Sequence, residues 1–260
     1  MKYPFRYCTA RTPAHLVPLT MIGIIICTLL FTHASADSSK FSIHEHNIPP
    51  EFSAKYEIHI NGISLGEIKV GLAKNTQSEW TYSSKAKTKG LAALIGGGQD
   101  MSETSHLRLI EDNIRPVLFE RIKASSSENK SERVIYAWHK NHVRATYKDR
   151  VLNETIDKYS LDLFTLQLSL MSNINKLPNE TRVTAISKAK FKDYLIIRHA
   201  DTILDTIYGA RNCIVIERKR GDASYKIWAD ANAHGLPLKI EHLENGKIQY
   251  AVSLVKSSLH

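Results

Sequence analysis

The side chains that could perform acid–base or nucleophilic chemistry are scattered along the chain. His139 and His142 flank Lys140-Asn141, a sequence typical of a hairpin tip, so we expect both histidines to be solvated turn residues. His199, Asp201 and Asp205 lie near one another in the sequence. The hydroxyl groups of Thr206, Ser224 and Ser253 could be proposed as nucleophiles. None of these hydroxyls lies in a Gly-x-Ser-x-Gly nucleophile elbow. The sequence therefore favours a protein that is not an enzyme, although residues distant in sequence can converge.

Patterns for metals, phosphates and reactive thiols are equally sparse. His44-Glu45-His46 offers two imidazoles without a third ligand in view, and neither His-Glu-x-x-His nor Cys-x-x-Cys occurs. Gly96-Gly97-Gly98 lacks the following Lys-Ser/Thr of a phosphate-binding loop and more simply ends a short helix. Cys213 lies in a strand-like run, where we expect a buried, inert thiol instead of a reactive or intermolecular one. We expect no metal and no cofactor.

The N-terminal region has the order of a secretory signal peptide. Lys2, Arg6 and Arg11 are followed by an apolar run over 21–31 and by Ala34-Ser35-Ala36, with no acidic residue before Asp37. The apolar run is shorter than the roughly 20 residues that a spanning helix needs, which disfavours an uncleaved anchor. We expect residues 1–36 to be removed by cleavage after Ala36, leaving a periplasmic protein without a stable membrane anchor.

The remaining chain is long enough for one large domain. Its formal net charge would be +6, because three of the basic residues behind the full chain's +9 leave with the signal. Since the basic residues are scattered among acids, they predict a solvated sheet surface and no nucleic-acid partner. Residues 37–52 form a polar leader that ends in Pro49-Pro50, and a single β-rich domain is expected over 53–260.

Most of that domain alternates apolar and polar residues with the period of two that marks strands. The runs occur at 56–60, 68–72, 80–82, 107–110, 117–122, 134–138, 143–147, 182–188, 194–199, 214–217, 226–229 and the hairpin 236–254. In that hairpin we predict a three-residue loop, Glu244-Asn245-Gly246, which pairs Ile240 with Tyr250 and Leu238 with Val252. A two-residue Asn-Gly loop would instead pair Leu243 with Ile248.

Two segments break this period. Residues 88–95 predict a short helix, and 161–174 predict a longer one, with Ser160 placed to cap its start. On the long helix one polar arc contains Asp162, Thr165, Ser169, Ser172 and Asn173, and apolar residues fill the rest, interrupted only by Gln167. A helix this apolar must be surrounded by its sheet.

The fold class that follows is mainly β: a strongly curved antiparallel sheet, open and barrel-like, wrapped around one long and one short helix. The apolar surface of the long helix is either plain core or one wall of a cavity for an apolar ligand. For the cavity alternative, the residues expected to line it are Leu163, Phe164, Leu168 and Met171.

Several positions together resemble the DUF3108 family of uncharacterised exported bacterial proteins. They are Tyr56, Gly62 and Gly66 near the start, the apolar helix after Asp162, and Trp228-Ala229-Asp230 followed by Gly235-Leu236-Pro237-Leu238-Lys239. Leu163 departs from the pattern, in which a proline often follows the aspartate. The resemblance spans about 56–254 and implies, at the level of the fold, a likeness to periplasmic lipoprotein carriers. It implies no catalytic residues.

Three functions are compatible with these observations. The one we favour is a non-enzymatic periplasmic protein that binds or carries a lipophilic component of the cell envelope. The second is an envelope assembly or scaffold protein with a filled core, and the third is an envelope hydrolase or transferase. The partner would be a lipophilic ligand or an envelope protein. A void between helix and sheet would favour the first function, and a solid core the second.

Overall fold

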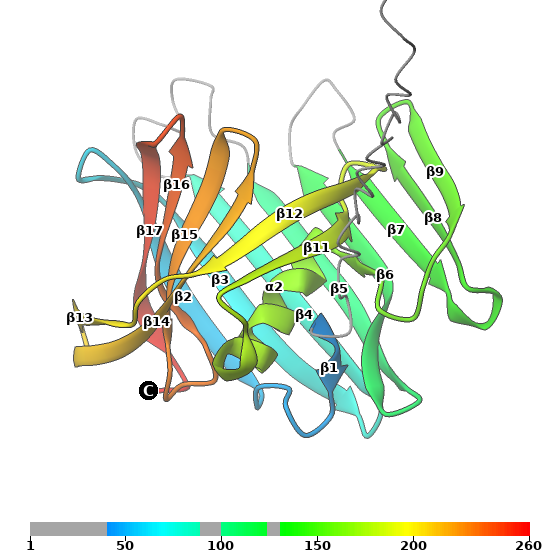
Figure 1. Ribbon diagram of the computed structural model, residues 1–260, viewed down its shortest axis with the longest axis horizontal. Helices are drawn as coiled ribbons and strands as arrows, with labels where there is room; N and C mark the ends of the chain where they lie inside the picture. Colours follow the sequence, from blue (N-terminus) through cyan, green and yellow to red (C-terminus); the bar gives the residue numbers. More distant parts are fainter. Residues whose placement is uncertain (1–40, 89–99, 124–130) are drawn as a thin grey trace, which may run out of the picture. The chain divides into compact units, whose positions relative to one another are not determined.

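The computed structural model describes residues 41–88, 100–123 and 131–260. The signal peptide lies outside the described residues, and so does the short helix expected over 88–95, apart from Thr88. The described residues form one large sheet and one α-helix (Figure 1).

The strands agree with the predicted period-two runs. They are β1 (Ile43–His44), β2 (Phe52–Ile60), β3 (Ile63–Thr76), β4 (Glu79–Thr88), β5 (Met101–Ile110), β6 (Asn113–Lys123), β7 (Glu132–Ala137), β8 (His142–Tyr147), β9 (Arg150–Thr155), β10 (Leu161–Asp162), β11 (Glu180–Ile186), β12 (Phe191–Arg198), β13 (Thr202–Thr206), β14 (Gly209–Arg220), β15 (Ala223–Asp230), β16 (Pro237–Glu244) and β17 (Lys247–Ser257). The helices are α2 (Leu163–Asn173) and the 3₁₀ turns η2 (Trp138–Lys140) and η3 (Ile174–Lys176). The short strands β1 and β10 and the strands β9 and β13 were not predicted.

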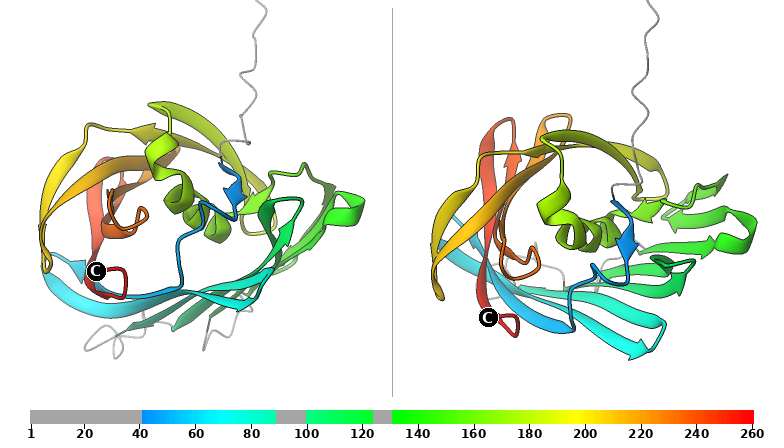
Figure 2. Two further views of the ribbon diagram at one scale, coloured as in Figure 1. Left: turned by 90° about the horizontal axis from the view of Figure 1, so that it is seen from below. Right: turned by 60° about the horizontal axis from the view of Figure 1, so that its bottom comes forward.

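Chain neighbours pair as antiparallel hairpins through most of the sheet, and β17 closes onto β2, so the two ends of the domain are hydrogen-bonded side by side. The short strand β10 instead pairs in parallel with β11. The sheet is strongly curved without closing into a barrel, and α2 lies inside the curve (Figure 2). The predicted fold class is confirmed for the sheet and the long helix.

The helix is packed on several sides, as its composition required. Phe164, Leu168 and Met171 join a core cluster with β2–β8, whereas Leu166 and Leu170 join a second cluster with β11, β12 and β14. Leu166 and Leu168 are fully buried. Burying a leucine side chain contributes roughly 1.5–3 kcal/mol, so these contacts hold an 11-residue helix that would be marginal alone.

The polar arc of the helix is buried as well, because the segment before β2 covers it. Ser169 donates a hydrogen bond to the Phe41 carbonyl, and Asn173 Nδ2 donates to the Ser42 carbonyl at 2.9 Å. Phe41 and Ile43 are themselves 1% exposed. The expectation of a domain starting at about Ser53 is therefore corrected: part of the leader belongs to the fold, because backbone carbonyls there satisfy the helix hydroxyl and amide groups.

The start of the helix also differs from the prediction. Asp162, and not Ser160, caps α2: its Oδ1 accepts the backbone N–H groups of Phe164 at 3.0 Å and Thr165 at 2.8 Å. Ser160 donates its hydroxyl to Asp157 in the preceding turn. Leu161 and Asp162 form β10, whose pairing with β11 delays the helix. Asp and Ser are both good caps, so local sequence alone did not separate them.

The predicted register of the last hairpin is wrong. Leu243 pairs with Ile248 across a two-residue Asn245-Gly246 turn, in which both residues have positive φ, as a type I′ turn requires. A bulge between His242 and Leu243 then shifts the ladder, so that Ile240 faces Val252. The bulge returns the apolar residues of both strands to one face of the sheet. The predicted register reached the same result with a three-residue loop.

Gly235 is the point where the loop before β16 meets the helix. Its φ is +69°, and a Cβ there would lie 2.9 Å from the Met171 carbonyl oxygen and 3.0 Å from Ile174. Only glycine tolerates both the left-handed backbone and this close approach. The Gly235-Leu236-Pro237 sequence thus positions the end of α2.

We predict that Gly235→Ala destabilises the protein more than Gly246→Ala. Gly246 has a similar φ of +72°, but a Cβ added there would have no atom within 4 Å, so it isolates the backbone cost of about 1 kcal/mol. Gly235→Ala should cost roughly 1–3 kcal/mol more because it overpacks the helix end. Urea unfolding of both variants measures the difference, and equal losses would contradict the packing argument.

Candidate functional site

An apolar cavity of about 220 Å³ lies between α2 and the curved sheet. Phe164, Gln167 and Leu170 face it from the helix; their spacing of three places them on one stripe. The opposite wall comes from the strands and is mostly apolar: Tyr56, Ile68, Val70, Ser84, Ala86, Met101, Glu103, Arg218, Tyr225, Ile227, Ile240, Tyr250 and Val252. Helix and sheet therefore do not meet in a fully solid core.

A second, polar cavity of about 280 Å³ adjoins the first. The two share several lining residues, among them Phe164, Gln167, Glu103 and Arg218. Its other residues include Arg121, Lys123 and Lys188, so basic groups outnumber the one carboxylate, Glu103. An apolar compartment thus opens directly onto a positively charged one.

The residues predicted to line a cavity divide into two pairs. Leu163 lines the polar cavity and Phe164 lines both cavities. Leu168 and Met171 line neither of them and are packed in the core, where their exposures are 0% and 4%. The helix residues that the prediction omitted are Gln167 and Leu170. Gln167 is the one polar residue within the apolar arc, so it could have indicated which side of the helix faces the cavity.

Arg218 stands at the junction of the two cavities, on β14. Its guanidinium lies 4.6 Å from the ring centroid of Tyr225 and 5.5 Å from that of Tyr194. Among the described residues, its buried Nε has no hydrogen-bond partner, and no carboxylate forms an ion pair with its guanidinium. Burial lowers the pKa of Arg218, the direction expected for a cation removed from water.

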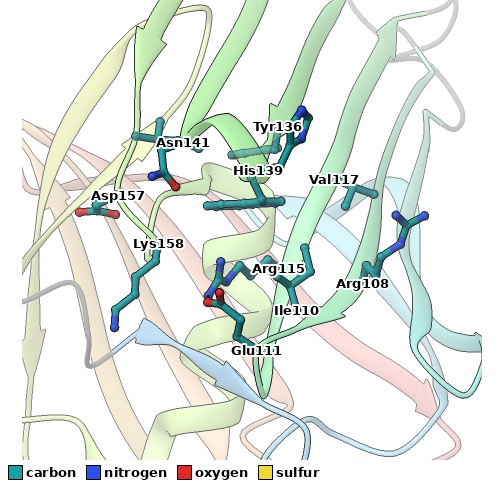
Figure 3. A pocket seen from close by; sticks show the side chains of 12 residues that line it. Arg108, Ile110, Glu111, Arg115, Val117, Tyr136, His139, Asn141, Asp157 and Lys158 are labelled. Atoms are coloured by element: carbon teal, nitrogen blue, oxygen red, sulfur yellow. The ribbon is translucent and has the colours of Figure 1, made fainter.

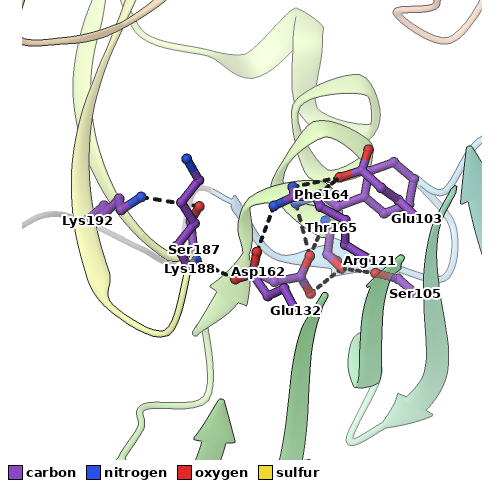
Figure 4. Close-up of polar contacts among 10 residues, drawn as sticks. All are labelled: Glu103, Ser105, Arg121, Glu132, Asp162, Phe164, Thr165, Ser187, Lys188 and Lys192. Atoms are coloured by element: carbon purple, nitrogen blue, oxygen red, sulfur yellow. Dashed lines mark hydrogen bonds and ion pairs between the residues drawn. The ribbon is translucent and has the colours of Figure 1, made fainter. Parts of the chain in front are cut away.

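The wall of the polar cavity is held by a buried ionic network (Figure 4). Arg121 Nε donates to Glu103 at 2.7 Å, and Arg121 Nη1 donates to Glu132 at 2.7 Å. Glu132 also accepts the backbone N–H of Lys188, which ties β7 to the turn after β11. Burial raises the pKa of Glu132 even though Arg121 opposes this. Because Arg121 already forms ion pairs with two carboxylates, its charge is neutralised within the protein.

Asp162 lies beside this network and is fully buried. Its Oδ2 accepts the Thr165 hydroxyl at 2.7 Å and faces the Tyr136 hydroxyl at 3.4 Å. Burial raises the pKa of Asp162 to about 6, although the hydrogen bonds from Thr165 and Phe164 lower it. The helix cap is therefore a group that titrates at mildly acidic pH.

A larger groove of about 810 Å³ lies elsewhere, between the β5–β6 hairpin, η2 and residues 156–158 (Figure 3). Its centre is a stack in which the Arg115 guanidinium lies 5.2 Å from the Trp138 ring, and Trp138 lies 5.2 Å from Tyr136. Arg115 forms an ion pair with Glu111 at 2.8 Å. The mostly buried cation of this groove is thus paired within the protein, unlike Arg218.

Several of the candidate acid–base and nucleophilic residues have other partners instead of contacting one another. His199 pairs with Glu217 at 3.1 Å, whereas Asp201 pairs with Arg198 at 3.2 Å. His142 contacts Asn153, and Thr206 donates to the Gly209 carbonyl. Among the described residues, no group of three or more His, Cys, Asp and Glu side chains is arranged to hold a metal ion.

Two further nucleophile candidates have structural explanations. Gly62-Ile63-Ser64-Leu65-Gly66 has the Gly-x-Ser-x-Gly spacing, but it runs from the β2–β3 turn into a strand, not into the helix of a nucleophile elbow. Cys213 is buried in the core, as expected, and burial raises the pKa of its thiol to about 11. A thiol with this pKa is protonated at neutral pH and therefore unreactive.

One curved antiparallel sheet wrapped around a buried helix, with an apolar cavity between them, defines a class of β-rich proteins with an internal cavity. Within this class the chain belongs to the DUF3108 family, whose description is "Protein of unknown function" and whose model matches residues 55–253. The motifs Trp228-Ala229-Asp230 and Gly235-Leu236-Pro237 lie inside that match. No curated protein matches the chain in sequence.

Two solved structures resemble the chain to different degrees, both at very low sequence identity. A β-barrel-like DUF1849 protein from Brucella abortus is 7% identical with a TM-score of 0.53, covering 80% of this chain and 96% of that one. A protein described as a lipoprotein from Parabacteroides distasonis is 8% identical with a TM-score of 0.33, covering 82% and 98%. The first supports the fold alone, and the second is too distant to support an argument.

Helices long and apolar enough to cross a membrane are absent from the part of the chain that the structure describes.

We predict that Asp162→Asn changes how stability depends on pH. The folded protein holds the Asp162 proton more tightly than the unfolded chain does, so this group's stabilisation is full below about pH 4 and is lost as pH rises through about 6. The loss amounts to roughly 3 kcal/mol. Asparagine keeps a capping oxygen without titrating.

Chemical denaturation of wild type and Asp162→Asn at several pH values between 4 and 7 measures this. The free energy of unfolding of the variant should increase relative to that of the wild type as the pH rises. Asp157→Asn is the matched control, because Asp157 is an exposed carboxylate that holds the turn just before the helix. A constant difference between wild type and Asp162→Asn across this range would contradict the prediction.

Proposed function

We propose that this protein is exported to the periplasm and there binds or carries a lipophilic component of the cell envelope, with an apolar chain lodged between α2 and the sheet. The observation that carries the proposal is the apolar cavity faced by Phe164, Gln167 and Leu170. Together with the adjoining polar cavity, it reaches the roughly 300–1,000 Å³ typical of ligand sites.

The energetics suit a modest affinity. Each buried methylene contributes about 0.8 kcal/mol, so a chain that buries about ten of them gains about 8 kcal/mol before ordering and association costs. Micromolar binding requires about 8.2 kcal/mol net, so burial of the chain alone gives weaker binding than that. A ligand that binds with micromolar affinity must therefore also make contacts with polar groups.

A second candidate, an assembly or scaffold protein, is favoured by the packing of most of the helix. Leu166, Leu168, Leu170 and Met171 are all buried, and they belong to two core clusters. Under this alternative the cavity is a packing defect with no occupant.

We predict that Gln167→Trp blocks binding of a fluorescent fatty acid while leaving stability nearly unchanged. Gln167 is only partly buried and faces both cavities, so an indole there fills space that a chain would occupy. Affinity should fall at least tenfold. Leu168→Trp is the matched control on the next residue: it should overpack the core and cost roughly 1–3 kcal/mol.

The measurements are a fatty-acid titration and a denaturation midpoint for each protein. Gln167→Ala, which enlarges the cavity, should keep binding. If the wild type shows no saturable binding, or if Gln167→Trp binds as well as the wild type, the cavity is not the ligand site and the scaffold alternative is favoured.

Export gives a separate prediction. The Ala34-Ser35-Ala36 sequence after an apolar run supports cleavage before Asp37. The intact mass of protein recovered from the periplasm should correspond to a chain beginning at Asp37. A mature protein that retains Ile24-Ile25-Ile26 would show that the segment is an anchor instead.

A further inference from the structure

The cavity and its neighbour have opposite chemical characters, and one residue connects them. The apolar cavity is lined mainly by aliphatic and aromatic side chains, whereas the polar cavity contains Arg121, Lys123, Lys188 and Arg218. Arg218 lines both. A ligand that fills the first cavity and extends out of it would present its end to this guanidinium.

Among the described residues, the basic groups that line the polar cavity outnumber the acidic ones. Glu103 is its only carboxylate among the described lining residues, and Glu103 is bound by Arg121 at 2.6 and 2.7 Å. Arg121 is in turn bound to Glu132. Arg218 and the exposed lysines Lys123 and Lys188 therefore have no ion-pair partner among the described residues that line this site.

The geometry of Arg218 also fits recognition of an anion. Tyr194 and Tyr225 lie against the guanidinium, at 5.5 and 4.6 Å, and hold it without using up its N–H donors. Its buried Nε lacks a hydrogen-bond partner among the described residues. An unpaired buried donor is costly, and a planar guanidinium pairs best with a carboxylate or a phosphate.

We propose that the ligand is an anionic single-chain amphiphile, whose chain occupies the apolar cavity and whose carboxylate or phosphate head binds Arg218, with Lys123 and Lys188 around it. This rests on the proposed function, because it takes the cavity as the binding site. The contact at the head group contributes binding free energy that burial of the chain alone does not provide. It also fixes the direction of the chain, head toward Lys188 and tail toward Val252.

A rival explanation is that Arg218 serves only the packing of the two tyrosine rings. The two explanations differ in what they predict for ligands that share a chain and differ in charge. If Arg218 is structural, its replacement changes the affinity for charged and neutral ligands alike. If it binds a head group, only the charged ligand loses affinity.

The test is displacement of the neutral fluorescent probe N-phenyl-1-naphthylamine at pH 8 by dodecanoate, dodecyl phosphate and dodecanol, each below its micellar concentration. The wild type should bind at least one of the anions about tenfold or more better than the alcohol. Arg218→Met, which keeps apolar length against the rings, should reduce that preference to about twofold or less and leave dodecanol binding unchanged. The two anions distinguish a carboxylate head from a phosphate head.

Lys219→Met is the matched control, because Lys219 is the next residue on β14, is exposed, and lines neither cavity. It removes the same charge and should behave as the wild type. Arg218→Lys should retain part of the preference, and thermal unfolding checks that each variant is folded. If Arg218→Met does not fold, the preference of the wild type and of Arg218→Lys for the anions over dodecanol still tests the head-group assignment.

The outcomes separate the two proposals. Equal binding of anion and alcohol by the wild type, or equal losses in Arg218→Met, would overturn the head-group assignment and leave the apolar site intact. If none of the three ligands displaces the probe, the proposed function itself fails.

Discussion

The buried carboxylate of Asp162 is the constraint on which the rest of the structure depends. It accepts two backbone N–H groups at the start of α2 and the hydroxyl of Thr165, at distances from 2.7 to 3.0 Å. Thr165 is linked in turn to Ser105 on β5, and Tyr136 on β7 approaches the same carboxylate. A charge this deep in the protein persists only while these donors surround it. The cap therefore fixes both the rotation of the helix and the strands that curve around it.

The rotation of the helix explains where the cavity lies. With Thr165, Ser169 and Asn173 turned toward Ser105 and the N-terminal segment, Leu168 and Met171 point into one cluster and Leu166 into the other. The remaining stripe contains Phe164, Gln167 and Leu170, and it faces strands that curve away from it. The ionic network of Arg121, Glu103 and Glu132 sits beside the start of that stripe, which makes one end of the space polar. The place of the cavity therefore follows from the helix placement that the cap fixes.

Periodicity was sufficient to predict the sheet, the long helix and the enclosure of that helix, because burial imposes a period of two on strands and leaves a surrounded helix with few polar positions. Features set by contacts between distant segments were not predictable in the same way. Neither Phe41 covering Ser169, nor β10 delaying the helix to Asp162, nor the bulge beside His242 has a local signature. Of the residues expected to line a cavity, Leu163 and Phe164 face the two cavities. A helix that is apolar everywhere outside one polar arc does not reveal which of its apolar sides is packed solid. Gln167 was the informative exception, since a polar residue in such an arc requires a polar or open neighbour.

The choice between a filled core and a ligand site depends on Arg218. A core that had only to be stable could hold an apolar side chain at this position, and replacement of buried charges by apolar residues of similar volume is often neutral or stabilising. This chain instead keeps a guanidinium between two tyrosines, next to an apolar space, and its buried Nε has no hydrogen-bond partner among the described residues. A packing defect does not require such a group, whereas a site for a charged amphiphile would use it. Because burial of the chain provides only modest affinity, a contact at the head group would also decide which amphiphile is retained. A carrier requires that combination: the apolar part of the site accepts many chains, and the charged part selects among them and can release them when the head group is bound elsewhere.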